Sequence, residues 1–175
     1  MTLTVETGTG LPDADAFIDL AFANAYHTAA GSSGWAGEDA DKEAAIRRAT
    51  SHLSDAYRWE GVRTRGRSQA LAWPRSGVSD AEGYGIASNT IPIELKRATA
   101  ELALRELVSP GSMNPDFVAS EAVKREKIGP IEVEYLNASV SADAKRPVVL
   151  IVRDMIGQFL CSERSGILAG TSYRT

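Results

Sequence analysis

The stretch Asp39–Tyr57, DADKEAAIRRATSHLSDAY, carries the pattern that decides the fold. Its apolar residues recur every three or four positions, which is the spacing of one face of an α-helix. Two aspartates open the stretch, where the helix dipole favours negative charge. The pattern predicts an amphipathic helix with one face in the core. The predicted core positions are Ile46, Ala49, Leu53, Ala56 and Tyr57.

Three more stretches show helical spacing on either side of this one, at about residues 13–29, 92–108 and 146–160. Asp13 or Asp15 can cap the first of them, because a carboxylate accepts the free backbone N–H groups of a first turn. Pro92 suits the first turn of the second, where a missing N–H costs nothing. The sequence therefore predicts a mainly α fold, a small bundle of about four long helices.

A strand pattern follows Gly129 and Pro130, where Ile131, Val133 and Tyr135 alternate with glutamates. This alternation predicts one dry and one wet face. A lone strand leaves its backbone groups unpaired, so it needs a partner. We expect either a hairpin partner within residues 138–140 or a strand from another subunit.

The flanking segments are less regular. Residues 117–128 suit a short helix or a mobile polar segment, and residues 137–146 suit a polar linker. The end of the chain, residues 161–175, holds too few apolar residues to fold alone. We therefore divide the chain into a helical core, residues 1–136, and a second part, residues 137–175, made of linker, C-terminal helix and extended tail.

Composition limits the class of protein. The chain has 175 residues, of which 43% are hydrophobic, enough for the core of one domain. The N-terminus lacks the basic and apolar regions of a signal peptide. The best membrane candidate, residues 147–160, is too short to cross a bilayer. The single cysteine, Cys161, excludes an intramolecular disulfide, so we expect a protein made in a reducing cytoplasm, without a membrane partner.

Charge is unevenly distributed along the chain. The net formal charge is −7 over residues 1–45, +5 over residues 46–75 and −2 over residues 76–175. Regions of opposite sign suit self-complementary assembly or one partner of each sign, and they equally suit solvated surfaces. The total of −4 is not typical of a duplex DNA-binding protein.

Motifs for catalysis and cofactors are absent from the sequence. Gly8-Thr-Gly10 lacks the third glycine of a dinucleotide fingerprint, and no phosphate loop is present. His27 and His52 come without a cluster of further metal ligands. Cys161 has no evident base beside it. We expect no enzyme activity, no cofactor and no metal.

The basic and aromatic loop, Arg58–Arg75, is the strongest candidate for a binding surface. Trp73 is held in an extended conformation by Pro74, so its ring points in a fixed direction. Three interpretations stay open: a protein interface, a nucleic-acid site where rings stack on bases, or a plug at the end of the bundle with solvated arginines. The residues in question are Trp59, Arg63, Arg65, Arg67, Trp73, Pro74 and Arg75.

An ordered set of short motifs, covering about residues 14–136, resembles the head-tail connector, or adaptor, proteins of tailed bacteriophages and gene transfer agents. Many of these carry the label DnaT-like single-stranded DNA-binding protein. Beyond residue 137 the likeness is weak. The matching pieces are Ala25-Tyr26, Trp35, KEAAIRRAT at 42–50, Leu53, Tyr57, EGVR at 60–63, QALAWPR at 69–75, Ile91-Pro92, KRATAELA at 96–103 and KIGPIEVEY at 127–135.

The resemblance implies a structural virion protein that catalyses nothing. It implies a ring, of twelve copies by this likeness, that lies beneath the portal protein in the neck of the virion and receives the next neck or tail-completion protein. Genomic DNA would pass through the ring without sequence-specific contacts. Ile131, Val133 and Tyr135 would pair between subunits. The tail would dock on the portal through Ile167, Leu168 and Tyr173. The alternative is a single-stranded DNA-binding replication protein that uses Trp59, Arg63, Arg65, Arg67 and Trp73.

Overall fold

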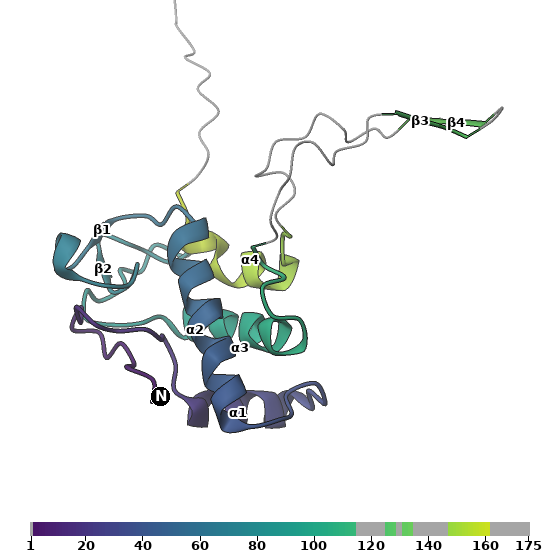
Figure 1. Ribbon diagram of the computed structural model, residues 1–175. Coiled ribbons are helices and arrows are strands. Elements are labelled where there is room, and N and C mark those ends of the chain that lie inside the picture. Colours follow the sequence, from purple (N-terminus) through teal and green to yellow (C-terminus); the bar gives the residue numbers. More distant parts are fainter. Residues whose placement is uncertain (1, 115–124, 129–130, 135–146, 162–175) are drawn as a thin grey trace, which may run out of the picture.

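The computed structural model describes residues 2–114, 125–128, 131–134 and 147–161 (Figure 1). These residues form a mainly helical structure with two small antiparallel ladders, which confirms the predicted fold class. The α-helices are α1 (Leu20–Ala30), α2 (Asp39–Ala56), α3 (Ile93–Val108) and α4 (Leu150–Ile156). The strands are β1 (Val62–Arg63), β2 (Arg75–Ser76), β3 (Arg125–Ile128) and β4 (Ile131–Glu134), and the 3-10 turns are η1 (Gly66–Ser68) and η4 (Gly157–Phe159).

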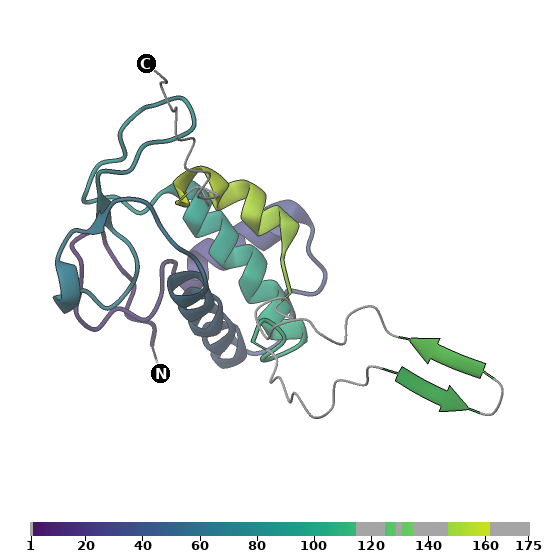
Figure 2. The ribbon, with the colours of Figure 1, turned by 90° about the horizontal axis from the view of Figure 1, so that it is seen from above.

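Helices α2 and α3 pack side by side and form the centre of the core (Figures 1 and 2). Both present alanines to the interface, which let the two backbones approach closely. Burying one leucine or isoleucine side chain stabilises a fold by roughly 1.5–3 kcal/mol, so each helix is held mainly by its buried face. The buried apolar residues are Ala45, Ile46, Ala49 and Leu53 on α2 and Leu95, Ala98, Leu102 and Ala103 on α3.

Helix α4 covers the opposite side of α3, as the view in Figure 2 shows. Val152 and Ile156 are its buried residues, and Phe159 in η4 continues the same face. The helix is shorter than the predicted span of 146–160, because η4 tightens the chain from Gly157 onward. The length predicted for this element was therefore wrong, although its buried positions follow the predicted spacing.

Helix α1 begins at Leu20, later than the predicted start near Asp13. Asp19 is the cap, and its carboxylate accepts the N–H of Phe22 at 2.7 Å. Asp15 serves another purpose: it accepts the N–H of Thr4 and pairs with Arg47 on α2. The prediction was wrong because the residues before Asp19 are occupied in joining the N-terminal segment to α2.

The strand predicted at residues 131–135 is confirmed over Ile131–Glu134. Its partner is β3, with Ile128 opposite Ile131 and Arg125 opposite Glu134. The hairpin partner predicted within residues 138–140 was wrong, because the partner β3 precedes the strand, and so was a helix reaching through residues 125–128. Pairing with a strand of another subunit stays a prediction. Within the described residues, neither strand contacts a helix (Figures 1 and 2).

Some predicted features lie outside the described residues, namely Tyr135, the linker at 137–146 and the tail residues Ile167, Leu168 and Tyr173. In the described part of the chain, no helix combines the length and the hydropathy that crossing a bilayer requires.

Candidate functional site

The segment from Arg58 to Ser76 folds back on itself, so that its two ends form the short ladder of β1 and β2. Val62 lies opposite Ser76 and Arg63 lies opposite Arg75. Gly61 makes this close return possible, because a Cβ at this position would lie 2.2 Å from the carbonyl oxygen of Ser76. Its φ of +65° is also in the region that glycine tolerates best.

The aromatic side of this loop faces the core. Trp73 has no exposed surface and Trp59 is 6% exposed. The two rings meet edge to face at 5.8 Å between centroids, and Trp73 meets Phe159 of η4 at 5.6 Å. The indole N–H of Trp59 donates to the carbonyl oxygen of Leu53 at 3.1 Å. Trp73 and Pro74, joined by a cis peptide bond, therefore form the plug that the sequence suggested, and neither tryptophan ring is available to stack on a ligand.

Arg75 holds the two ends of the loop together. Its guanidinium group donates to four backbone carbonyl oxygens, those of Trp59, Glu60, Gly61 and Ala72. Burial is the main cause that lowers the pKa of Arg75, and the nearby charge of Arg63 lowers it further. In the structure its partners are carbonyl groups, because the turn of the loop points them inward.

Gln69 also holds the loop together, although no role was predicted for it from the sequence. Its side chain is almost fully buried. The amide nitrogen donates to the carbonyl oxygens of Leu71 and Pro74, and the amide oxygen accepts the N–H of Arg65 at 3.3 Å. A polar residue directly before the apolar run of residues 70–73 is a signal for such a buried network, because a buried amide must find partners.

The outer side of the loop carries the remaining arginines. Arg65 is exposed and its Nε donates to the carbonyl oxygen of Thr9 at 3.2 Å. Arg63 is half-buried and its Nη1 lies 3.5 Å from the carbonyl oxygen of Gln69. Arg67 and Arg58 are exposed. Within the described residues, none of these four arginines pairs with a carboxylate. The loop therefore presents positive charge that the described residues leave uncompensated.

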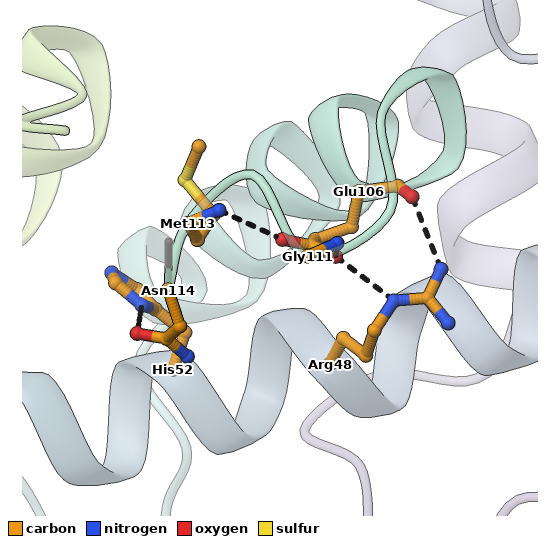
Figure 3. A network of polar contacts seen from close by, with 6 residues as sticks. All are labelled: Arg48, His52, Glu106, Gly111, Met113 and Asn114. Atoms are coloured by element: carbon orange, nitrogen blue, oxygen red, sulfur yellow. Dashed lines mark hydrogen bonds and ion pairs between the residues drawn. The ribbon is translucent and has the colours of Figure 1, made fainter. Parts of the chain in front are cut away.

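Arg48 on α2 shows the contrasting arrangement (Figure 3). Its Nε lies 2.9 Å from Oε2 of Glu106 on α3, a residue that is 2% exposed. The same carboxylate accepts the N–H groups of Gly111 and Met113 at 2.8 and 3.1 Å. This network joins α2, α3 and the loop after α3. No role was predicted for Glu106 from the sequence, because one of its partners is far away along the chain and the others are backbone groups.

The other predicted site residues are placed only in part. Ile131 and Val133 lie on β4, opposite Ile128 and Glu126 of the same chain.

The two histidines lie in different surroundings. His27 Nε2 lies 3.0 Å from the carbonyl oxygen of Ala100, and His52 Nδ1 lies 3.3 Å from the amide oxygen of Asn114. Among the residues that the structure covers, no group of three histidine, cysteine or acidic side chains could hold a metal ion.

Comparison with known proteins gives one match. A family model described as "Putative DnaT-like ssDNA binding protein" matches residues 1–174. No curated protein and no solved structure matches the chain. Because the family match extends over almost the entire sequence, the chain belongs to this DnaT-like family.

Proposed function

We propose that this protein binds single-stranded DNA by holding its phosphates against the outer side of the loop formed by residues 58–76. The proposal rests on three arginines, Arg63, Arg65 and Arg67. They lie on one short segment and have no carboxylate partner among the described residues. The family description supports the same class of ligand.

The charge near the loop matters more for this proposal than the net charge of the whole chain. The chain is net negative by four charges, but residues 46–75 carry a net +5. Screening reduces interactions beyond about 8–10 Å at ordinary ionic strength, so a strand at the loop responds mainly to the nearby arginines.

The mode of binding follows from the burial of Trp59 and Trp73. A typical single-strand site combines basic residues with exposed rings on which bases stack. Here both tryptophans fill the core, so the loop contacts phosphate rather than base. The proposed site is therefore indifferent to sequence and sensitive to salt.

The test is fluorescence anisotropy of a labelled single strand at several salt concentrations. Neutralising Z phosphates on a single strand gives a slope of about −0.7Z in log K against log salt. Three arginines predict a slope near −2 by the same relation. The double variant Arg65→Gln, Arg67→Gln should flatten the slope and weaken binding. The matched control, Arg97→Gln, removes one exposed charge from α3 and should leave the slope unchanged.

A salt-insensitive interaction, or equal losses from the loop variant and the α3 control, would exclude the proposed phosphate site. Failure of the wild-type protein to bind any single strand would exclude the function itself.

A second candidate function is the head-tail connector implied by the resemblance. Two observations favour an assembly role: the ladder of β3 and β4 contacts no helix among the described residues, and α4 exposes apolar side chains at its start. Exposed apolar patches often mark protein interfaces. The exposed residues are Val148, Leu150 and Ile151. On this proposal the chain forms a ring, of twelve copies by the likeness, between the portal protein and the next neck protein of a virion.

Native mass spectrometry of the purified protein and cryo-electron microscopy of particle necks test the second candidate. A closed ring beneath a portal would support it and would make the outer arginines a lining or a contact between copies. Particles whose neck lacks this chain, together with a purified protein that binds single strands, would leave the first proposal as the function.

A further inference from the structure

The loop of residues 79–85 is an ordered turn next to the arginine segment. Ser79 and Gly85 form an antiparallel bridge. The Asp80 carboxylate accepts the N–H groups of Glu82 and Tyr84 at 3.0 and 2.8 Å, and the N–H of Asp80 donates to the carbonyl oxygen of Tyr84 at 2.9 Å. These bonds fix the backbone at the turn, and a fixed backbone holds Tyr84 in one position.

The same loop is fastened to the body at both ends. The N–H of Ala81 donates to the side-chain oxygen of Gln158 in η4 at 3.0 Å. The N–H of Ile86 donates to the carbonyl oxygen of Val78, whose side chain is 2% exposed. The turn is therefore fastened to the body, while residues 81–85 themselves are exposed.

Tyr84 lies at the tip of this rigid turn and is 69% exposed. Of the aromatic side chains that the structure describes, it is the one in the exposed class. In the described part of the chain it makes no side-chain hydrogen bond and no ring contact. A rigid turn that holds an aromatic ring in water, without a partner, suits a ligand with a flat apolar face.

The charged residues near Tyr84 indicate whether a base or a phosphate of the DNA strand would lie at this turn. Glu82 is exposed in the same turn and would repel a phosphate. Arg58 is exposed, and its carbonyl oxygen accepts the N–H of Cys161, three residues beyond the Gln158 whose side chain accepts the N–H of Ala81. Arg58 therefore belongs to the same part of the molecule as the turn. The turn therefore suits a base, and the positive charge beside it suits the adjoining phosphate.

We propose that Tyr84 is a stacking residue for one unpaired base of a single strand, with Arg58 contacting the phosphate next to that base. The inference rests on the proposed function and deepens it, because it supplies the exposed ring that Trp59 and Trp73 cannot. The strand then runs from the arginines of the β1 and η1 segment to the turn at Tyr84.

The experiment compares two labelled oligonucleotides of equal length and charge, an oligothymidylate and its abasic counterpart. Each has about 20 nucleotides, longer than the roughly 4–16 that one single-strand site covers. The proteins are the wild type, Tyr84→Ala, Tyr84→Phe and Val108→Ala. Val108 is 68% exposed on α3, so its variant controls for the loss of exposed apolar surface. Thermal melts confirm that each variant is folded.

Wild type should bind the oligothymidylate more tightly than the abasic strand. Tyr84→Ala should weaken binding of the oligothymidylate by about 5- to 100-fold, the range for one stacked base, and leave the abasic strand unaffected. Tyr84→Phe and Val108→Ala should bind like the wild type, since the first keeps the ring and the second lies elsewhere.

Unchanged binding of oligothymidylate by Tyr84→Ala overturns the inference, while the salt dependence of the arginine loop still supports the proposed function. Equal losses on both strands also overturn it, because a stacking residue must distinguish a base from its absence. A variant that binds DNA normally but no longer self-associates overturns it too and makes Tyr84 a contact between copies. If the wild type binds neither strand, both the inference and the proposed function fail.

Discussion

Two groups of arginines in this protein have the same chemistry and opposite surroundings. Arg48 pairs with buried Glu106, and Arg75 donates to four backbone carbonyl groups. Arg65 and Arg67 lie on the outside of the loop that Arg75 closes, without a carboxylate partner among the described residues. Both Arg75 and Arg67 come from one basic stretch of sequence, so charge alone does not reveal which arginine builds the fold and which faces a ligand.

The two groups of arginines differ in how many of their N–H donors are bonded to other groups of the chain. A guanidinium group has five N–H donors, and a site that fills most of them from the chain's own carbonyls has little left for a partner. A site that fills few of them keeps its charge available. We therefore expect inner substitutions to change stability, and outer substitutions that remove charge to change salt-dependent binding. Three predictions test that separation, and a fourth concerns a buried histidine.

The largest effect is expected on the inner side of the loop, from Trp73→Ala. Removing a fully buried large aromatic side chain costs about 3–5 kcal/mol. Urea denaturation followed by circular dichroism measures the loss. Trp35→Ala is the control at a half-buried tryptophan and should cost less. An unchanged midpoint for the Trp73 variant would contradict its position in the core.

The next effect is expected from Glu106→Ala. This change removes the acceptor of Arg48 and of the N–H groups of Gly111 and Met113. Unpaired buried donors cost about 1–3 kcal/mol each, and water can reach the half-exposed Arg48, so we expect a total near 3 kcal/mol. Asp55→Ala removes the acceptor of an exposed hydrogen bond from the Ser51 hydroxyl on α2 and should cost at most about 0.5 kcal/mol. Similar losses in the two variants would refute the assigned network.

Arg75→Lys tests the comparison at constant charge. A lysine has three donors on one nitrogen and cannot reach four carbonyl oxygens at once, so stability should fall by about 2 kcal/mol. The salt slope of DNA binding should not change, because the charge is kept. Arg67→Lys is the matched outer variant and should change neither quantity. A large stability loss in the Arg67 variant would erase the distinction between the two groups.

The smallest effect concerns His27. Burial is the main cause that lowers its pKa, and the neutral ring donates from Nε2 to the carbonyl oxygen of Ala100, while Nδ1 has no partner among the residues that the structure describes. Since the folded state resists protonation, the unfolded state binds more protons below about pH 6.5. Stability should therefore be complete above that pH and fall as the pH drops, by at most about 1.4 kcal/mol per pH unit.

The measurement is the urea midpoint at several pH values between 7.5 and 5, for wild type and His27→Gln. The variant keeps a donor near Ala100 and has no titrating ring. It should lose the part of the pH dependence that His27 causes. Parallel curves for the two proteins would show that His27 is not the group responsible.

The helical part of the fold could be predicted from sequence where the pattern is local. The apolar spacing in α2 and α3 is complete, and Asp39 and Pro92 mark their starts. The start of α1 could not be predicted, because Asp13, Asp15 and Asp19 could each cap a helix, and the contacts of Asp15 with Thr4 and Arg47 are not visible in the local pattern. The partner of β4 was missed because β3 has a mixed polar sequence that local pattern does not distinguish from a loop.

The site was predictable in part. The buried position of Trp73 follows from Pro74 and the surrounding alanines, whereas Gln69, Glu106 and the partners of Arg75 depend on contacts between distant segments. The family match confirms the DnaT-like part of the resemblance. The connector role, the docking role of Ile167, Leu168 and Tyr173, and pairing between subunits stay predictions.

The three tryptophans make this protein easy to follow by nuclear magnetic resonance. The indole N–H of Trp35 donates to Asn24, and that of Trp59 donates to a backbone carbonyl. The indole N–H of Trp73 is buried and has no acceptor within the described part of the chain. Hydrogen bonding and solvent access set the chemical shift and the exchange rate of an indole proton. One ¹⁵N-labelled sample should therefore report on the α1 side, the edge of the loop and the centre of the core through three separate signals.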